Sequence, residues 1–344
     1  MRHIFIKLFP FLIALFIFQS CQSDKQKPDV SDSPVHMKIE RFDQEIAQLQ
    51  PAAILDKNKQ WQAEYGLFYT DYMRYMLKVG DPQDSIYLQD ILSKVVQKKD
   101  FIDLAAAVQK KFPDLKKQEQ ELTQAFRYIH YYFPDYKIPR LISFFSGFEV
   151  QVPLGEGYIG IGLDMFLGQE SPFYPALINS IPLYISRRFT PENITPRVVE
   201  AVIREELFPE KDADVNTLQQ MVYHGKVLYA MDLLLDAPDS LKIGYTSKQM
   251  EWAQHYQKDV WKWFLDEDLL YNTDYLRTQK YFTEAPFSPE LGENNESAPK
   301  LGSFIGWQIV RKFMEKHPEL GLKELFEHSN AQELLSASKF KGWG

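Results

Sequence analysis

The N-terminus carries a short apolar run that ends just before the only cysteine of the chain. Residues 1–20 begin with two basic side chains, Arg2 and Lys7, and continue with the apolar run 8–18, LFPFLIALFIF. Eleven residues rise only about 16 Å as a helix, whereas the hydrocarbon core of a bilayer is about 30 Å thick. The run is therefore too short for a permanent membrane span and is typical of a signal peptide.

Cys21 follows directly after the small residue Ser20, and this arrangement resembles the bacterial lipobox. In a lipobox the cysteine receives a diacylglycerol and the preceding peptide is removed, and two or three acyl chains such as palmitate hold a protein stably at a membrane. An ordinary secretory peptide with a chance cysteine is the alternative, because Phe18 and Gln19 depart from the commonest pattern. We expect a signal peptide over residues 1–20 and a lipid anchor at Cys21, which places the protein in the cell envelope at the inner or outer membrane.

With Cys21 used for lipid, no cysteine remains for a disulfide, so the exported domain must be stabilised by its core alone. The chain is rich enough for this, with 344 residues, 45% of them hydrophobic, including 25 Phe and 19 Tyr. Residues 22–35, QSDKQKPDVSDSPV, are polar and contain two prolines, which indicates a flexible tether. We therefore divide the mature chain into a lipidated tether over residues 21–37 and one domain over residues 38–344.

The charge of the chain argues against nucleic acid as a partner. The formal net charge is −8, and loss of Arg2 and Lys7 with the leader lowers it to −10. A protein that binds nucleic acid needs a basic surface that neutralises phosphates, and no basic block is present.

Hydrophobic periodicity predicts a mostly α-helical α+β domain. Apolar residues recur at spacings of three and four over residues 60–133, including one stripe from Trp61 to Met76. Strand-like patterns occur near residues 36–42, 139–145 and 158–163, and helical patterns resume from residue 175 onward. We expect a small antiparallel sheet or hairpin embedded at mid-chain.

Familiar catalytic motifs fail in their local context. Residues 155–160, GEGYIG, match a dinucleotide-binding pattern, but they precede a strand instead of opening a helix, so a hairpin turn explains the glycines better. The seven histidines include no H-E-x-x-H pair, and no G-x-S-x-G is present. Adjacent acids such as Glu205 and Glu206 are best interpreted as solvated faces. We predict no catalytic residues, no metal ligands and no cofactor.

Two further patterns have a structural interpretation. Gly302 and Gly306 form a G-x-x-x-G on a helix that also carries charged residues, so we expect close approach of a second element, and Gly225 is interpreted in the same way. The aromatic run over residues 128–136 could bind a sugar or a peptide, but core packing is the simpler explanation.

Several segments together resemble the gliding-motility lipoprotein GldB family of Bacteroidota. They are KIERFD at 38–43, YIHYYFP at 128–134, IGIGLDMFLG at 159–168, MVYHGKVLY at 221–229, IGYT at 243–246 and IGWQIVR at 305–311. The resemblance implies an envelope lipoprotein that works with the gliding machinery tied to type IX secretion. It implies neither an enzymatic activity nor a cofactor.

A more distant resemblance is to predicted zinc peptidases of gluzincin-type layout, in which an H-E-x-x-H helix precedes a helix containing Glu-Gly. Here the first helix would be VVEAVIREEL at 198–207, which has no histidine, and His224-Gly225 stands in place of Glu-Gly. The resemblance implies a fold without the metal motif, whose groove could bind a partner through Arg204, Glu205 and His224.

These observations favour a non-catalytic, membrane-anchored component of the gliding or secretion assembly that acts through contacts with other envelope proteins. The alternatives are an envelope metal-dependent hydrolase or peptidase, and a lipoprotein that binds peptide or glycan.

Overall fold

The computed structural model describes residues 27–210, 215–292, 294 and 296–343. The predicted signal peptide and Cys21 lie outside the described residues. Most of the described chain is helical, and a sheet of four strands lies near its middle. The predicted mostly helical α+β fold is thus confirmed.

The first helical region surrounds one aromatic ring. Phe42 contacts five other rings at centroid distances of 5.1–6.0 Å: Trp61, Tyr65, Phe68, Tyr69 and Tyr72. The predicted stripe from Trp61 to Met76 is buried, but it does not follow a single helix, because Gly66 (φ +52°) separates two helices. The elements are α1 (Phe42–Ala47), η1 (Pro51–Ala53), α2 (Ile54–Tyr65), α3 (Leu67–Asp71), the π-helical η2 (Tyr72–Met76), α4 (Ser85–Val96) and α5 (Lys99–Lys111).

The sheet differs from the predicted antiparallel one. Its order is β1-β2-β4-β3, where β1 is Ile39–Glu40, β2 is Arg140–Phe144, β3 is Leu154–Gly155 and β4 is Tyr158–Gly162. Only β3 and β4 pair antiparallel, through a two-residue turn in which Gly157 has φ +77°. This is the predicted hairpin. The β1–β2 and β2–β4 pairs are parallel, because the N-terminal segment supplies β1 and the chain returns through β3 on the far side of β4.

The remaining elements cover the sheet and build the second half of the molecule. After α6 (Lys116–Tyr132) and the sheet come η3 (Leu163–Phe166), η4 (Tyr174–Leu177), α7 (Leu183–Ser186), η5 (Pro191–Asn193), α8 (Ile194–Val202) and the π-helical η6 (Ile203–Leu207). Then follow α9 (Thr217–Leu234), α10 (Asp239–Ile243), α11 (Ser247–His255), α12 (Gln257–Asp266), α13 (Tyr275–Thr278), η7 (Gln279–Tyr281), α14 (Leu301–Lys316), α15 (Leu322–Glu327) and α16 (Ala331–Ser338).

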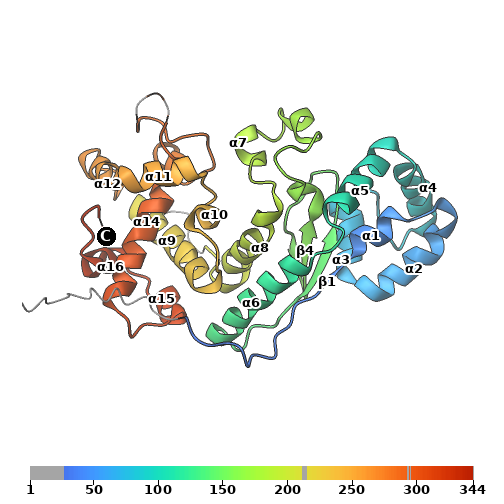
Figure 1. Cartoon of the computed structure of the whole chain (residues 1–344), viewed down its shortest axis with the longest axis horizontal. Coiled ribbons are helices and arrows are strands. Elements are labelled where there is room, and N and C mark those ends of the chain that lie inside the picture. Colours follow the sequence, from blue (N-terminus) through green and yellow to red (C-terminus); the bar gives the residue numbers. More distant parts are fainter. Residues whose placement is uncertain (1–26, 211–214, 293, 295, 344) are drawn as a thin grey trace, which may run out of the picture.

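The molecule is elongated in Figure 1. Helices α1–α5 gather at one end, the sheet with α6 and α8 stands in the middle, and α9–α16 form the other end. Within the residues that the structure describes, no helix is both long and apolar enough to cross a membrane.

Helices α9 and α14 cross at glycines, as predicted. A Cβ added to Gly225 would lie 2.3 Å from the carbonyl oxygen of Gly306, and one added to Gly306 would lie 1.8 Å from that of Met221. Only hydrogen at these positions allows the two backbones to approach this closely.

The described part of the predicted flexible tether, residues 27–37, is packed on the domain. Residues 27–37 pack along α6 and the end of α9, and Val30, Val35 and Met37 are buried. The amide of Met37 donates to Thr123 Oγ1 at 3.0 Å, and Arg127 Nε donates to the Val35 carbonyl at 3.1 Å. Composition alone suggested a solvated linker, but its three apolar side chains find buried positions on the folded domain.

Candidate functional site

The structure brings together two of the three predicted groove residues. Arg204 lies on η6 and His224 on α9, and Arg204 Nη2 is 3.3 Å from His224 Nδ1. Glu205, the next residue on η6, is exposed and forms no hydrogen bond or ion pair with either of them. The predicted trio therefore divides into a half-buried contact and a surface carboxylate.

Sequence reasoning missed Glu200, which is the carboxylate at the centre of this site. Its Oε1 accepts from Arg204 Nε at 3.0 Å, and its Oε2 accepts from Arg197 Nη1 at 2.9 Å. Glu200 precedes Arg204 by four residues, so both side chains lie on one helical face. The Glu-x-x-x-Arg spacing within VVEAVIREEL was the signal that could have revealed the pair.

Glu200 and Arg204 are four residues apart, like the two ligands on a zinc-binding helix, and His224 comes from a second helix. Such a helix places two ligands at i and i+4, and a neighbouring helix supplies the third. Here the second position is Arg204, whose guanidinium has five N–H donors and no lone pair to offer a metal. Among the described residues, no group of three or more His, Cys, Asp or Glu side chains could hold a metal ion. The residues present therefore do not fit zinc.

A second ion-paired carboxylate extends the site. Glu284 Oε1 accepts from Arg188 Nη1 at 2.5 Å and from Lys300 Nζ at 2.6 Å. The ring of Phe282 stacks on the imidazole of His224 with a centroid distance of 5.2 Å. We call the whole set the ion cluster: Arg188, Arg197, Glu200, Arg204, His224, Glu284 and Lys300.

The ion cluster changes the protonation of its members. Burial, followed by the charge of Arg204, lowers the pKa of His224 to about 3, so the imidazole is neutral at physiological pH. Burial raises the pKa of Glu200, but the charges of Arg197 and Arg204 outweigh it and hold the pKa below its ordinary value. Burial lowers the pKa of Lys300 to about 8, although Glu284 opposes this shift.

An aromatic groove of about 720 Å³ lies beside the ion cluster. Arg204 connects the two, since its guanidinium carbon lies 5.7 Å from the centre of the Tyr223 ring. Four rings form a ladder along the groove, with successive centroid distances of 5.9, 4.4 and 5.2 Å: Phe133, Phe326, Phe208 and Tyr223. The other lining residues are Leu207, Pro209, Glu210, Val215, Gln219, Val222, Lys226, Lys323, Glu327, Ser329 and Ala331.

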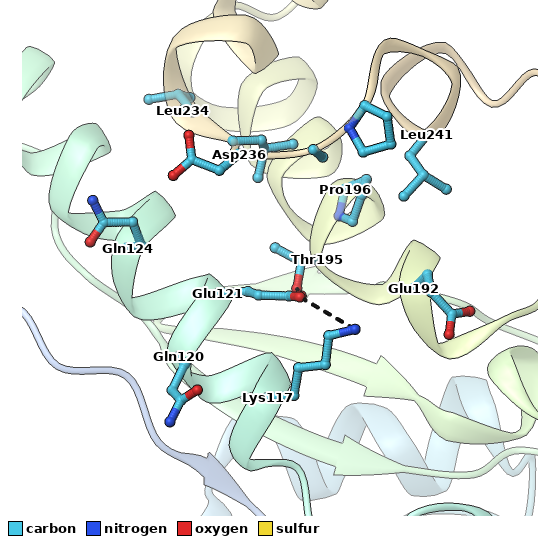
Figure 2. Close-up of a pocket in the computed structure, with 13 residues that line it drawn as sticks. Lys117, Gln120, Glu121, Gln124, Glu192, Thr195, Pro196, Leu234, Asp236 and Leu241 are labelled. Carbon is cyan, nitrogen blue, oxygen red and sulfur yellow. Dashed lines mark hydrogen bonds and ion pairs between the residues drawn. The ribbon is translucent and has the colours of Figure 1, made fainter. Parts of the chain in front are cut away.

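A second pocket, of about 440 Å³, lies between α6, the start of α8 and the segment that follows α9 (Figure 2). In Figure 2 the side chains of Lys117 and Glu121 reach toward Thr195, whose hydroxyl donates to Glu121 Oε2 at 2.7 Å. Asp236, also at its rim, pairs with Lys27. None of the predicted groove residues lines this pocket.

The predicted aromatic run does not form one binding surface. Tyr128 is buried in the core, Tyr131 is 55% exposed, and Phe133 lines the aromatic groove. Tyr136 stacks on Phe126 and donates a hydrogen bond to Glu206. Most of this run serves packing, and only Phe133 reaches a described pocket.

Residues 23–342 match the protein family described as "Gliding motility protein GldB". The chain belongs to this family. The match spans nearly the whole chain after residue 22, including both pockets and the ion cluster. No curated protein and no solved structure gives a significant match.

Membership in the GldB family confirms the predicted resemblance and associates the chain with gliding motility as a lipoprotein. The segments that carried the resemblance have structural roles where they can be followed. In KIERFD, for example, Arg41 donates two hydrogen bonds of 2.8 Å to the buried carboxylate of Asp43, which also accepts one from Ser143.

Proposed function

We propose that this GldB-family chain is a non-catalytic, membrane-anchored component of the gliding or type IX secretion machinery that acts through contacts with other envelope proteins. Family membership supports the process. The observation that carries the non-catalytic part is the guanidinium of Arg204, which occupies the position between Glu200 and His224 where a hydrolase of similar layout would need an open metal.

The acid–base properties of His224 and Glu200, two members of the ion cluster, support the same proposal. A general acid or base works best when its pKa lies near the operating pH. His224 has a pKa of about 3, and the Glu200 carboxylate is held ionised by two arginines. Neither group is suited to exchange protons near neutral pH.

We include Arg204, Glu205 and His224 in the proposal as the border of the contact surface. Glu205 is exposed, and Leu207, two residues further along η6, lines the aromatic groove. Replacing all three with glutamine should weaken cross-linking to envelope partners or reduce gliding. If cells carrying the triple variant glide and cross-link normally, these residues do not belong to the surface.

Metal content separates this proposal from the hydrolase alternative. The mature chain, purified natively without a histidine tag, should contain far less than one zinc ion per molecule. Near-stoichiometric zinc would overturn the non-catalytic proposal and direct attention to histidines outside the ion cluster, such as His130 and His255.

Anchoring at Cys21 has its own test. We expect Cys21→Ser to abolish incorporation of labelled palmitate and to leave uncleaved or misplaced precursor, because the thiol is the only acceptor for the thioether-linked lipid. A serine variant that is still labelled and membrane-bound would contradict the lipobox assignment.

A further inference from the structure

We propose that the aromatic groove binds an apolar peptide segment of an envelope partner, and that an acidic side chain of this segment pairs with Lys226. The inference rests on the proposed docking function and names the chemistry of the docked segment. Its basis is a buried ammonium group at an apolar cavity.

Lys226 lines the groove from α9 and is only 3% exposed. Its Nζ donates one hydrogen bond, of 2.5 Å, to the His328 carbonyl, although an ammonium group has three N–H donors. Among the residues that the structure describes, no carboxylate lies within ion-pair distance of it. By contrast, the buried Lys242 and the mostly buried Lys300 each have a carboxylate partner at 2.7 Å or less.

A buried charge without a counter-ion is costly, so such a group either loses its proton or acquires an anionic partner. Burial lowers the pKa of Lys226 to about 8, which still leaves the amine mostly protonated at neutral pH. Its Nζ also lies 5.4 Å from the centre of the Phe208 ring, and this contact favours the cationic form. A carboxylate entering the groove would supply charge-assisted hydrogen bonds to the remaining donors.

The shape of the groove suits a short peptide. Its volume of about 720 Å³ lies within the range of roughly 300–1,000 Å³ that is typical of ligand pockets. The ring ladder and Val222 offer apolar contacts to side chains, while Gln219 and Ser329 offer polar groups that a peptide backbone can use. A fatty acid would match the rings and Lys226 but would leave these polar groups unused.

The charges at the rim favour a singly charged group. Lys323, Glu210 and Glu327 also line the groove, so the two acids outnumber the one exposed cation. These acids would repel a phosphate dianion or an anionic membrane surface, whereas one carboxylate directed at Lys226 meets a positive charge.

The test compares two probe peptides on the mature chain carrying Cys21→Ser. The probes are acetyl-Leu-Glu-Phe-amide and acetyl-Leu-Gln-Phe-amide, which differ by one charge at nearly constant shape. By titration calorimetry at pH 7, the Glu peptide should bind about tenfold more tightly or better, as expected for a hydrogen-bonded charge pair. Lys226→Met should remove this preference, since it keeps an apolar stem and deletes the ammonium.

Lys248→Met, on the exposed part of α11, is the matched control and should leave the preference unchanged. Equal affinity of the two peptides for the unsubstituted chain would overturn the proposal, even if Lys226→Met failed to fold. Laurate that binds more tightly than the Glu peptide would assign the groove to lipid instead. If neither peptide binds while Cys21-dependent anchoring and partner cross-linking persist, the docking function stands and this assignment of the groove fails.

Discussion

At the residue scale, Arg204 is the side chain that most affects what this molecule can do. It bonds to Glu200 and His224 in the ion cluster, and it lies over Tyr223 at the edge of the aromatic groove. A zinc ion would leave a coordination position for water, whereas a guanidinium supplies a fixed positive charge without one. The positive charge of Arg204 also adds to the effect of burial in keeping His224 neutral.

The neutral state of His224 in the folded protein predicts a pH dependence of stability. The unfolded chain protonates this imidazole below its ordinary pKa of about 6.5, whereas the folded chain does so only near 3. The free energy of unfolding should therefore fall as the pH drops from about 6.5 toward 3. His224→Gln, which keeps an acceptor for Arg204, should lose less stability between pH 7 and pH 4 than the parent in urea unfolding.

The exposed His255, at the end of α11, provides the control for this prediction. His255→Gln should reproduce the parent's pH profile. A His224→Gln profile parallel to that of the parent would mean that the imidazole titrates in the folded protein as it does in the unfolded chain.

At the scale of elements, the crossing of α9 and α14 determines how the second half of the molecule packs. Gly225 and Gly306 lie against each other's helices, and Lys226 follows Gly225 directly. The close crossing therefore also sets where the lysine stands relative to the groove.

Gly306→Ala should lower the free energy of unfolding by about 2–4 kcal/mol, because the new methyl group would overlap the Met221 carbonyl and force the helices apart. Gln308→Ala, two residues further along α14, is the control and should change stability by less than about 0.5 kcal/mol. Denaturant unfolding of the two variants checks the difference. Equal stabilities would show that the helices separate without cost.

At the scale of the whole molecule, the docked segment over residues 27–37 would limit the distance between the domain and a membrane to which Cys21 is anchored. Lys27 Nζ donates to the Leu235 carbonyl at 2.8 Å and lies 5.3 Å from the centre of the Tyr128 ring. Lys27 is six positions after Cys21, and a fully extended chain over six steps spans about 20 Å. If Cys21 carries the lipid, the junction of α6 and α9 stays near the bilayer.

Energy transfer to a membrane can test this orientation, because the only native thiol would be lipidated and an introduced cysteine can be labelled alone. Tyr131→Cys lies one turn after Tyr128 on α6, and Ile86→Cys is an exposed position on α4 at the far end of the molecule (Figure 1). A dye at Tyr131→Cys should transfer more efficiently to an acceptor in the bilayer. Equal transfer from both sites would mean that the domain tumbles freely above the membrane.

The sequence by itself determined features that depend on neighbours a few residues apart. Spacings of three and four predicted the helices, Glu156-Gly157 predicted the hairpin turn, and Gly225 and Gly306 predicted a close helix approach. Each of these features follows from turn chemistry or from the period of side chains along an element, and both act between residues that are close in sequence.

Only the tertiary structure decided which distant segments meet. Ile39 pairs in parallel with Leu141, the tether residues dock on α6, and Arg204 of η6 meets His224 of α9. The burial of Lys226 likewise arises from the crossing of α9 and α14. Such contacts depend on the shapes of two surfaces far apart in the chain, and the periodicity of one segment carries no information about the surface that it will meet.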